Sequence, residues 1–218
     1  MALLEYTPPT EPWLKILYQD EDLLVLDKPS GLLSVPGKAP EHKDSLQHRA
    51  QSVFPTATVV HRLDMATSGI MLMALNKHSH RHISAQFQHR QTDKIYQARV
   101  WGNPQQDCGE VDLPLICDWP NRPKQMVDME KGKAALTKWR VLESEQASTR
   151  VELLPVTGRS HQLRVHMLSL GHPILGDRLY AHPQALQMAE RLQLHACMLA
   201  LTHPVTEEPI RFDSPCPF

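Results

Sequence analysis

Val59-Val60-His61-Arg62-Leu63-Asp64-Met65-Ala66-Thr67-Ser68-Gly69 is the stretch around which this chain is organised. The two valines are typical of a strand end, and the small residues from Ala66 to Gly69 predict a turn before the apolar run from Ile70 to Leu75. We therefore expect Asp64 at the mouth of a loop, beside the permanently charged Arg62. These residues alone leave two interpretations open, a solvated or helix-capping aspartate and a functional carboxylate.

The composition is that of an ordinary globular chain. Of its 218 residues, 41% are hydrophobic and 22% are charged, which allows a sizeable core in one large domain or two small ones. No apolar run approaches the roughly 20 residues that span a bilayer, and the first ten residues lack the cationic start and long apolar run of a signal peptide. We therefore expect a cytoplasmic protein with no membrane partner.

Metal and nucleotide sites are not predicted. The four cysteines are too scattered for a zinc knuckle or a disulfide framework, so reduced thiols are expected. His78, His80 and His82 have no neighbouring carboxylate or cysteine to complete a ligand set, which favours an exposed basic helix face. The stretch from Gly31 to Lys38 fails as a phosphate loop, because its glycine spacing is wrong and Pro36 removes an amide.

Charge is unevenly distributed along the chain, although the formal net charge is only −1. The stretch from Thr58 to Arg99 has six Lys or Arg residues against two acids, and so does the stretch from Trp119 to Arg140. A basic belt on an otherwise acidic protein is what a localised contact with a phosphate backbone requires, but many solvated surfaces have the same pattern.

The hydrophobic pattern predicts an α+β protein, with a mixed, mainly antiparallel sheet and peripheral helices. The expected strands are residues 14–18, 23–26, 59–60, 70–75, 93–101, 134–143, 149–154 and 192–201. The expected helices are residues 44–53, with Asp44 or Ser45 as the cap, and residues 77–91, with Asn76 as the cap. One further helix that Ser160 caps and a short one after Pro183 are also expected. Residues 102–109 and the proline-interrupted residues 114–124 are expected to be loops.

Two residues in these elements are candidates for a site. Tyr96 shares a strand face with Ala98 and Val100, which suits either a core aromatic or a functional one. Arg164 is expected near the apolar edge of its helix, where a cation requires a buried or half-buried carboxylate partner. Asp64 is a candidate for that partner.

Six stretches of this chain, in this order, resemble the motifs of the RluA family of pseudouridine synthases. They are Leu23–Leu32, His61–Gly69 with its His-Arg-Leu-Asp core, Lys94-Ile95-Tyr96, Gly158–His166, Gly171–Asp177 and Leu194-His195-Ala196. The compact length and the stretch from Asp112 to Gln125 resemble the A type of this family, which modifies both 23S ribosomal RNA and transfer RNA.

The resemblance implies a single pseudouridine synthase domain over residues 14–218 with a central RNA-binding cleft, after an irregular lead-in over residues 1–13. Many relatives carry an N-terminal S4-like RNA-binding domain, which we do not expect here because fewer than twenty residues precede the first motif. The implied substrates are structured RNAs, a 23S ribosomal RNA loop and transfer RNA anticodon stem-loops. No cofactor, metal ion or obligate protein partner is expected, and the default state is a monomer.

The implied reaction converts uridine to pseudouridine by cutting the glycosidic bond at N1 and remaking it at C5. Asp64 matches the nucleophile of the family, and attack at C1′ of the ribose and at C6 of the uracil both remain open. Tyr96 matches the tyrosine that stacks on the target uracil. Arg164 would keep Asp64 ionised through an opposite charge at hydrogen-bonding distance.

Four further residues are predicted to bind substrate. Arg62 would fill the space left by the flipped uridine or hold a flanking phosphate. Leu194 is the first candidate and Leu175 the second for packing on the other face of the base, and His61 is a further contact. For His61, as for His161 and His166, structural or RNA-contact roles are favoured over a role as catalytic base.

Two other functions remain open at this point. The chain could be a catalytically inactive RNA-binding protein or RNA chaperone of the same fold, which would be expected to have lost Asp64 or Tyr96. A nucleoside hydrolase or glycosidase would pair Asp64 with a second acid. Asp177 is the one candidate in the motif stretches, and its position after Gly176 is more typical of a turn.

Overall fold

The computed structural model describes residues 6–218 and divides the chain into two compact units. Of the described residues, 6–94 and 196–217 form one unit, which we call the Asp64 unit, and 95–195 with Phe218 form the other, the Tyr96 unit. The chain passes from one unit to the other within strand β5 (Asp93–Trp101) and again within strand β11 (Leu194–Thr202).

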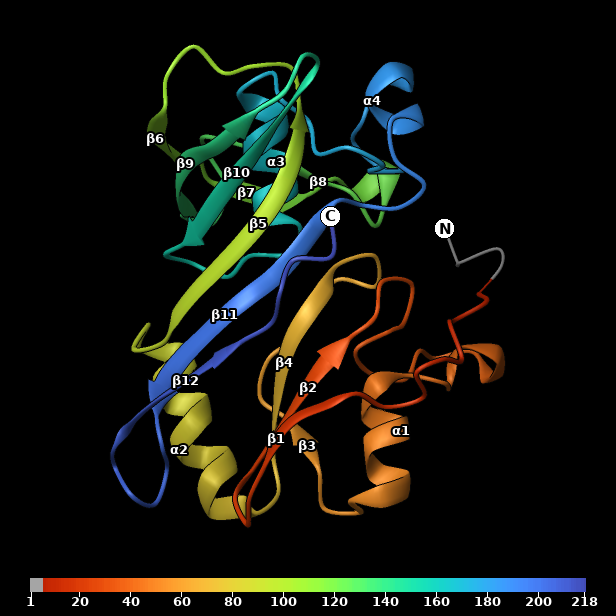
Figure 1. The fold of residues 1–218 in the computed structure, drawn as a ribbon, viewed down its shortest axis with the longest axis vertical. Coiled ribbons are helices and arrows are strands. Elements are labelled where there is room, and N and C mark those ends of the chain that lie inside the picture. Colours follow the sequence, from red (N-terminus) through yellow and green to blue (C-terminus); the bar gives the residue numbers. More distant parts are fainter. Residues whose placement is uncertain (1–5) are drawn as a thin grey trace. The chain divides into compact units, whose positions relative to one another are not determined.

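The Asp64 unit contains an antiparallel sheet and two α-helices (Figure 1). Its elements are β1 (Ile16–Gln19), β2 (Leu23–Lys28), the 3-10 helix η1 (Pro40–His42), α1 (Leu46–Val53), β3 (Thr58–Val59), β4 (Ser68–Ala74), α2 (Lys77–Gln88), the second part of β11, and β12 (Pro209–Asp213). β2 pairs with β1 and β4, β11 lies next to β4, and β12 pairs with β11.

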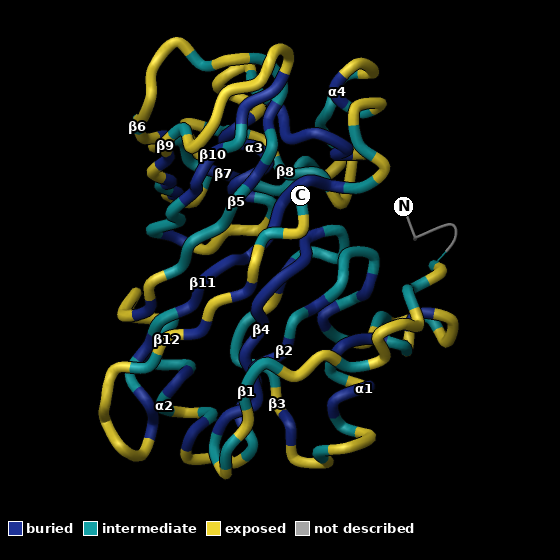
Figure 2. Tube along the Cα trace, viewed as in Figure 1, coloured by how far each residue is buried: buried dark blue, intermediate teal, exposed yellow. Residues whose placement is uncertain are grey.

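Both faces of this sheet are covered, which explains the apolar runs Leu23–Leu26 in β2 and Ile70–Ala74 in β4. Alternate residues of a strand point to opposite faces. Leu23 and Val25 pack with Ile83 of α2, whereas Leu24 and Leu26 pack with the helix α1. Figure 2 shows β2 and β4 as buried along most of their length, and β4 is buried at every residue.

Residues 6–13 of the predicted lead-in form no helix or strand, and residues 1–5 lie outside the described part. The lead-in is attached to the unit by the fully buried Arg49 of α1. Arg49 donates hydrogen bonds to the carbonyl oxygens of Pro9, at 2.8 Å, and Trp13, at 3.2 Å, and forms an ion pair with Asp44 at 2.6 Å. The tyrosine hydroxyl of Tyr6 donates to the carbonyl of Asp44 at 2.9 Å.

The Tyr96 unit contains an antiparallel sheet in the order β5-β10-β9-β6, and a separate hairpin of β7 and β8. Its further elements are β6 (Cys108–Asp112), β7 (Leu115–Cys117), the 3-10 helix η2 (Trp119–Asn121), β8 (Gln125–Val127), β9 (Leu136–Ser144), β10 (Ser148–Pro155), α3 (Gln162–Ser169) and α4 (Pro183–Gln187). Gln162 and His166 of α3 contact Thr137 of β9, so α3 covers one face of this sheet.

The predicted α+β class with a mainly antiparallel sheet is confirmed. The predicted surface loop over residues 114–124 was wrong in part, because residues 115–117 form β7. β7 and β8 are three residues each, too short to show a period, and the prolines flank or connect them rather than interrupting them. Strands β6 and β12 were not predicted.

The predicted helix caps are confirmed at Ser45 and Asn76, whose side chains accept hydrogen bonds from the backbone N–H groups of His48 and Ser79. The prediction of Ser160 as a cap was wrong. His161 occupies the cap position of α3, with a left-handed φ of 54° and no capping side-chain bond. Instead, the Gln162 side chain accepts from the backbone N–H of Arg159 at 3.0 Å. Among residues 6–218, no helix is long and apolar enough to cross a membrane.

We predict that Gly69→Ala strongly destabilises the protein. Gly69 has a φ of +112°, and an added Cβ would lie 2.6 Å from the backbone nitrogen of Ala196, where the neighbour cannot move independently of its strand. Overpacking and backbone strain together should lower the free energy of unfolding by about 3 kcal/mol or more. Gly158→Ala is the control, because nothing lies within 4 Å of its added Cβ. Equal urea-unfolding midpoints for the two variants would contradict the packing argument.

Candidate active site

Asp64 lies in the loop between β3 and β4, as predicted, and its side chain is half-buried. The loop turns at this residue, since the backbone N–H of Thr67 donates to the Asp64 carbonyl at 3.1 Å. Leu63, just before it, is buried, and Arg62 is exposed. The exposure of Arg62 is what its predicted RNA contact requires.

The segment after β2 holds this loop in place through main-chain contacts. The backbone N–H of Gly31 donates to the Met65 carbonyl at 2.9 Å, and the Ser30 hydroxyl donates to the Ala66 carbonyl at 2.7 Å. The Ser34 hydroxyl donates to the Leu63 carbonyl at 2.6 Å and accepts from the Leu63 N–H at 3.1 Å. The carbonyl groups on both sides of Asp64 are therefore fixed.

Lys28, the last residue of β2, is fully buried beneath the same loop. Its Nζ donates to three carbonyl oxygens, those of Pro29 at 2.9 Å, Leu32 at 2.6 Å and Met65 at 2.9 Å. Three acceptors match the three N–H groups of an ammonium ion. Burial lowers the pKa of Lys28 to about 7, while the negative charge of Asp64 raises it.

His61 is engaged within the fold. Its Nε2 accepts the backbone N–H of Leu72 at 2.9 Å, and its ring stacks on Phe87 with centroids 4.7 Å apart. Burial, with a smaller effect of the positive charge of Lys94, lowers the pKa of His61 to about 3, so the ring is neutral. These contacts give His61 a structural role, and its assignment to substrate binding stays a prediction.

Tyr96 belongs to the other unit, in β5, and it is half-buried. It lies opposite Leu153 of β10, two residues from the fully buried Ala98 on the same strand face. This is the alternation that the sequence predicted. The strand therefore orients the Tyr96 ring toward the face on which Leu153 packs.

Arg164 of α3 is buried, as predicted, and within its unit the buried carboxylate that meets it is Asp177. The guanidinium forms a two-pronged ion pair, with Nε 2.8 Å from Oδ2 and Nη2 2.7 Å from Oδ1. The two side chains are only 5% and 1% exposed. Asp177 is thus more than a turn residue, although its turn after Gly176, which has a φ of +69°, is also present. Asp64 and Arg164 belong to different units, and their predicted pairing stays a prediction.

Tyr180 adds a second contact to Arg164. The guanidinium carbon of Arg164 lies 5.0 Å from the Tyr180 ring centroid. The Tyr180 hydroxyl lies 2.6 Å from Nδ1 of His161 and accepts the backbone N–H of Gln125 at 2.8 Å. Tyr180 therefore connects the arginine with the start of β8.

The other predicted residues of this unit lie in its packed interior. Leu175 is fully buried and Leu194 is 3% exposed. Leu175 is held by backbone bonds to Arg99 and Gln193. His166 is buried between Thr137 and the Leu113 carbonyl, and this burial lowers its pKa, which supports a structural role. The assignment of Leu194 or Leu175 to the uracil stays a prediction.

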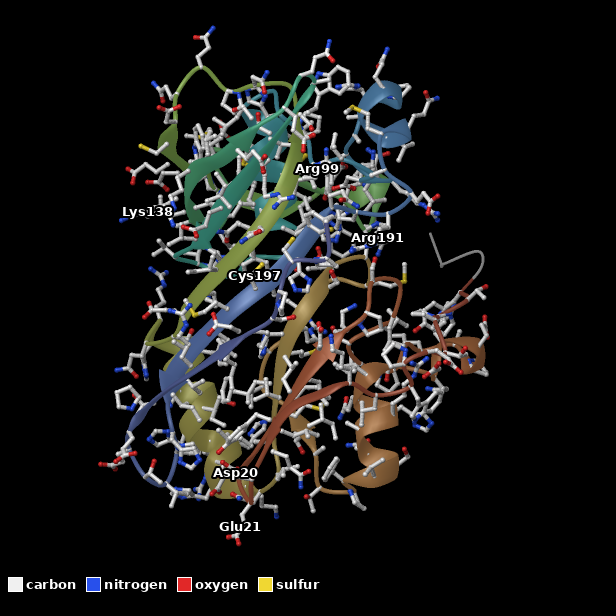
Figure 3. The ribbon with its side chains drawn as sticks, in the orientation of Figure 1. Asp20, Glu21, Arg99, Lys138, Arg191 and Cys197 are labelled. Carbon is white, nitrogen blue, oxygen red and sulfur yellow. The ribbon has the colours of Figure 1, made fainter. Side chains whose placement is uncertain are left out.

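In the described part of the chain, one group of side chains has its potential metal-ligand atoms close together. It consists of Asp20, Asp22 and His203. Oδ2 of Asp20 already accepts from the Tyr18 hydroxyl at 2.7 Å and contacts Nε2 of His203 at 3.0 Å, and Oδ1 accepts two backbone N–H groups. Asp20 lies at the turn between β1 and β2 (Figure 3). Because these bonds account for its oxygen atoms, we assign the group to stabilising that turn.

The comparisons with known proteins point to one family. Residues 22–169 match the model of the RNA pseudouridylate synthase family. The chain is 58% identical to the dual-specificity RNA pseudouridine synthase RluA of Escherichia coli (strain K12) over 219 residues, with all of both chains covered. It is 54% identical to the protein of the same name from Vibrio cholerae, covering all of this chain and 89% of that one.

A solved structure gives the same result. Human RNA pseudouridylate synthase domain containing 1 superposes with a TM-score of 0.79 at 30% identity, covering 94% of this chain and 84% of that chain. The family model spans parts of both units, so they belong to one family domain.

Sequence reasoning missed Lys28, Ser30 and Tyr180 as site residues. A signal for Lys28 was present, since it ends an apolar strand that is otherwise buried on both faces and it lies in the first family-like motif. The Tyr180 signal was weaker, because its contacts come from segments far apart in the sequence.

We predict that Lys28→Met destabilises the protein in a pH-dependent way. Three carbonyl groups would lose their donor, at a cost of about 1–3 kcal/mol each where they stay unsatisfied. Between pH 7 and the ordinary lysine pKa of 10.5, the unfolded chain binds a proton that the folded chain has released, so wild-type stability rises with pH. The stability advantage of the wild type over the variant should then grow by up to about 1.4 kcal/mol per pH unit.

Urea unfolding of both proteins at several pH values from 7 to 10 measures this difference. A difference that does not change with pH would show that Lys28 stays charged over the whole range, and would contradict the lowered pKa.

We also predict that Asp177→Asn costs about 3 kcal/mol of stability and most of the turnover, because it leaves Arg164 buried without its charged partner. Asp213→Asn is the matched control. Its partner Arg211 and Asp213 itself are 62% and 58% exposed, and pairs so exposed contribute little to stability. Thermal unfolding and single-turnover assays compare the two variants, and equal losses would mean that burial of the Arg164 pair is unimportant.

Proposed function

The chain belongs to the RNA pseudouridylate synthase family, and on that premise we propose that it isomerises uridine in stem-loops of both 23S ribosomal RNA and transfer RNA. It is a pseudouridine synthase, an isomerase that acts on RNA. The dual substrate range is supported by the names of its similar relatives, which are called dual-specificity enzymes, and by the A-type stretch from Asp112 to Gln125.

The observation that carries the catalytic proposal is the placement of Asp64. A half-buried carboxylate lies on a turn whose neighbouring carbonyls are bound by Lys28, Ser30 and Ser34. We assign Asp64 as the nucleophile that attacks C1′ of the ribose or C6 of the uracil. Either attack requires an ionised carboxylate held in one orientation, because a nucleophile that is already positioned avoids the entropic cost of bringing it to the reacting carbon.

Lys28 supports this role electrostatically. In its protonated form, its positive charge attracts the carboxylate of Asp64, and in a buried environment such an interaction is screened less than in water. The side chain of Lys28 donates three hydrogen bonds, and all three acceptors are main-chain carbonyls. It is therefore a positioning residue, which acts through the loop and not on the substrate.

The remaining roles follow from the chemistry of the reaction. A uridine within a stem-loop must leave its stack before Asp64 can reach it, at a cost of a few kcal/mol. The exposed Arg62 would offset this cost, since a guanidinium both stacks on bases and donates to phosphates. Tyr96, with Leu194 as the apolar partner, is assigned to contact the uracil, and Arg164 to keep Asp64 ionised.

The isomerisation moves a bond within one nucleoside, so its atoms and electrons balance without an oxidant, a hydrolytic water or a donated group. We propose that the protein acts as a cytoplasmic monomer on RNA alone. The two stretches rich in Lys and Arg, Thr58–Arg99 and Trp119–Arg140, supply charge for the phosphate backbone.

We predict that Asp64→Asn abolishes pseudouridine formation in both RNAs, because the amide cannot act as the nucleophile. Purified protein is incubated with unmodified transfer RNA and with 23S ribosomal RNA, and carbodiimide treatment followed by primer extension maps pseudouridine. Wild-type protein should give a new stop in each RNA, and Asp64→Asn should give none. RNA affinity should change little, because Asp64 is assigned to the chemical step.

Glu21→Gln is the control for a carboxylate change in the same unit, because Glu21 is exposed at the turn between β1 and β2 (Figure 3). It should leave both stops intact. Stops in only one RNA with the wild type would restrict the substrate range, and equal stops with Asp64→Asn would overturn the assignment of the nucleophile.

A further inference from the structure

Trp119 is more exposed than any other tryptophan, tyrosine or phenylalanine among the described residues, at 64%. It lies in η2, in the segment that connects β7 to β8 (Figure 1). The guanidinium carbon of Arg122 lies 4.5 Å from the ring centroid, so one face of the indole is covered by a cation. Arg122 is itself exposed, so the pair lies at the surface of the protein.

Trp13 shows the contrast. Its ring also has an arginine against it, with the guanidinium carbon of Arg49 at 4.2 Å, but Arg49 is fully buried and bound to Asp44. Trp13 thus packs over a structural ion pair. Nothing comparable accounts for the exposure of Trp119, and large exposed aromatics are typical of binding surfaces.

The segment that carries Trp119 is held in one conformation by its own hydrogen bonds. The backbone N–H of Asp118 donates to the Lys124 carbonyl at 3.0 Å, and that of Lys124 donates to the Asn121 carbonyl at 3.1 Å. The Asn121 side chain donates to the Asp118 carboxylate at 2.9 Å. An ordered ring loses little freedom when it binds, which favours recognition.

The base of the hairpin is anchored near Arg164. Leu115 and Val127 pack with Val165 of α3 and with Tyr180, and the Gln125 N–H donates to the Tyr180 hydroxyl at 2.8 Å. The Tyr180 ring in turn lies 5.0 Å from the guanidinium carbon of Arg164. The base of the β7–β8 hairpin is therefore apolar and fixed. The segment between the two strands carries an exposed indole with a guanidinium on one face.

We propose that Trp119 and Arg122 form a stacking contact for an unpaired nucleotide of the RNA stem-loop, other than the target uridine. This inference rests on the proposed function, since it names a contact made by the same substrate. The base would stack on the free side of the indole, and Arg122 would add a cation for the neighbouring phosphate. Stacking of bases on aromatic rings is tolerant of sequence, which suits an enzyme with two substrates.

Charge favours RNA over a protein as the occupant. The stretch from Trp119 to Arg140 has six Lys or Arg residues and two acids. One of those acids, Asp128, is directed at its own backbone, where it accepts the N–H groups of Glu130 and Lys131. Lys138 is exposed and projects outward from β9 (Figure 3). An unpaired base next to a phosphate matches an exposed indole with a cation on one face.

The test measures the affinity of full-length protein for a fluorescein-labelled transfer RNA anticodon stem-loop by anisotropy. Trp119→Ala should weaken binding about tenfold, equivalent to about 1.4 kcal/mol, and Trp119→Phe should restore most of it. The single-turnover rate at saturating RNA should stay within about twofold of the wild type, because the contact is made away from the reacting atoms. Arg122→Ala should reduce the slope of log Kd against log salt by about one.

Trp13→Ala is the matched control and should leave affinity for the stem-loop unchanged. A blunt RNA duplex without a loop should bind wild type and Trp119→Ala equally. Unchanged stem-loop affinity in Trp119→Ala would overturn the proposal, as would an equal loss on the duplex. If the variant instead altered only self-association in sedimentation, the surface would be a contact between copies and the proposal would also fail. Failure of the proposed function would appear separately, as wild-type protein that binds the stem-loop without forming pseudouridine.

Discussion

A fully buried lysine sets the constraint on which the Asp64 loop depends. A cation in the interior is tolerated only when its hydrogen-bond donors are satisfied, and Lys28 satisfies its donors with carbonyls of the segment that follows β2 and of Met65. Lys28 and Met65 are 37 positions apart in the sequence. Moving the turn would leave the ammonium unsatisfied, so the loop that presents Asp64 has little freedom to shift.

The sheet of the Asp64 unit makes this arrangement possible. β2 and β4 pair along their whole length, from Leu23 opposite Ala74 to Lys28 opposite Gly69. Because α1 and α2 cover both faces, the register cannot slip without exchanging the two apolar sets. The register places the end of β2 beside the start of β4, and the Asp64 loop enters β4 at that point. Core packing and loop position are thus consequences of one strand pairing.

Features that depend on local sequence could be predicted. The strand from Asp93 to Trp101 and the cap of α2 at Asn76 follow from alternation and capping, which involve neighbouring residues, and both are confirmed. The contact of Arg164 with Asp177 was not predicted, because the approach of Asp177 depends on how a later turn folds back onto α3. Lys28 was overlooked for the same reason. Its site consists of carbonyl groups, and every residue type has one.

The buried cations of the two units have different partners, and the chemistry of each cation explains the difference. Lys28 is a compact ammonium with three donors, and it is met by separate carbonyls that carry no net charge. Those contacts carry no negative charge, so the protonated form of Lys28 still acts on Asp64. Arg164 presents a planar fork, and Asp177 neutralises it with two parallel bonds while the Tyr180 ring lies at its face. An arginine held at one edge and one face keeps a fixed plane.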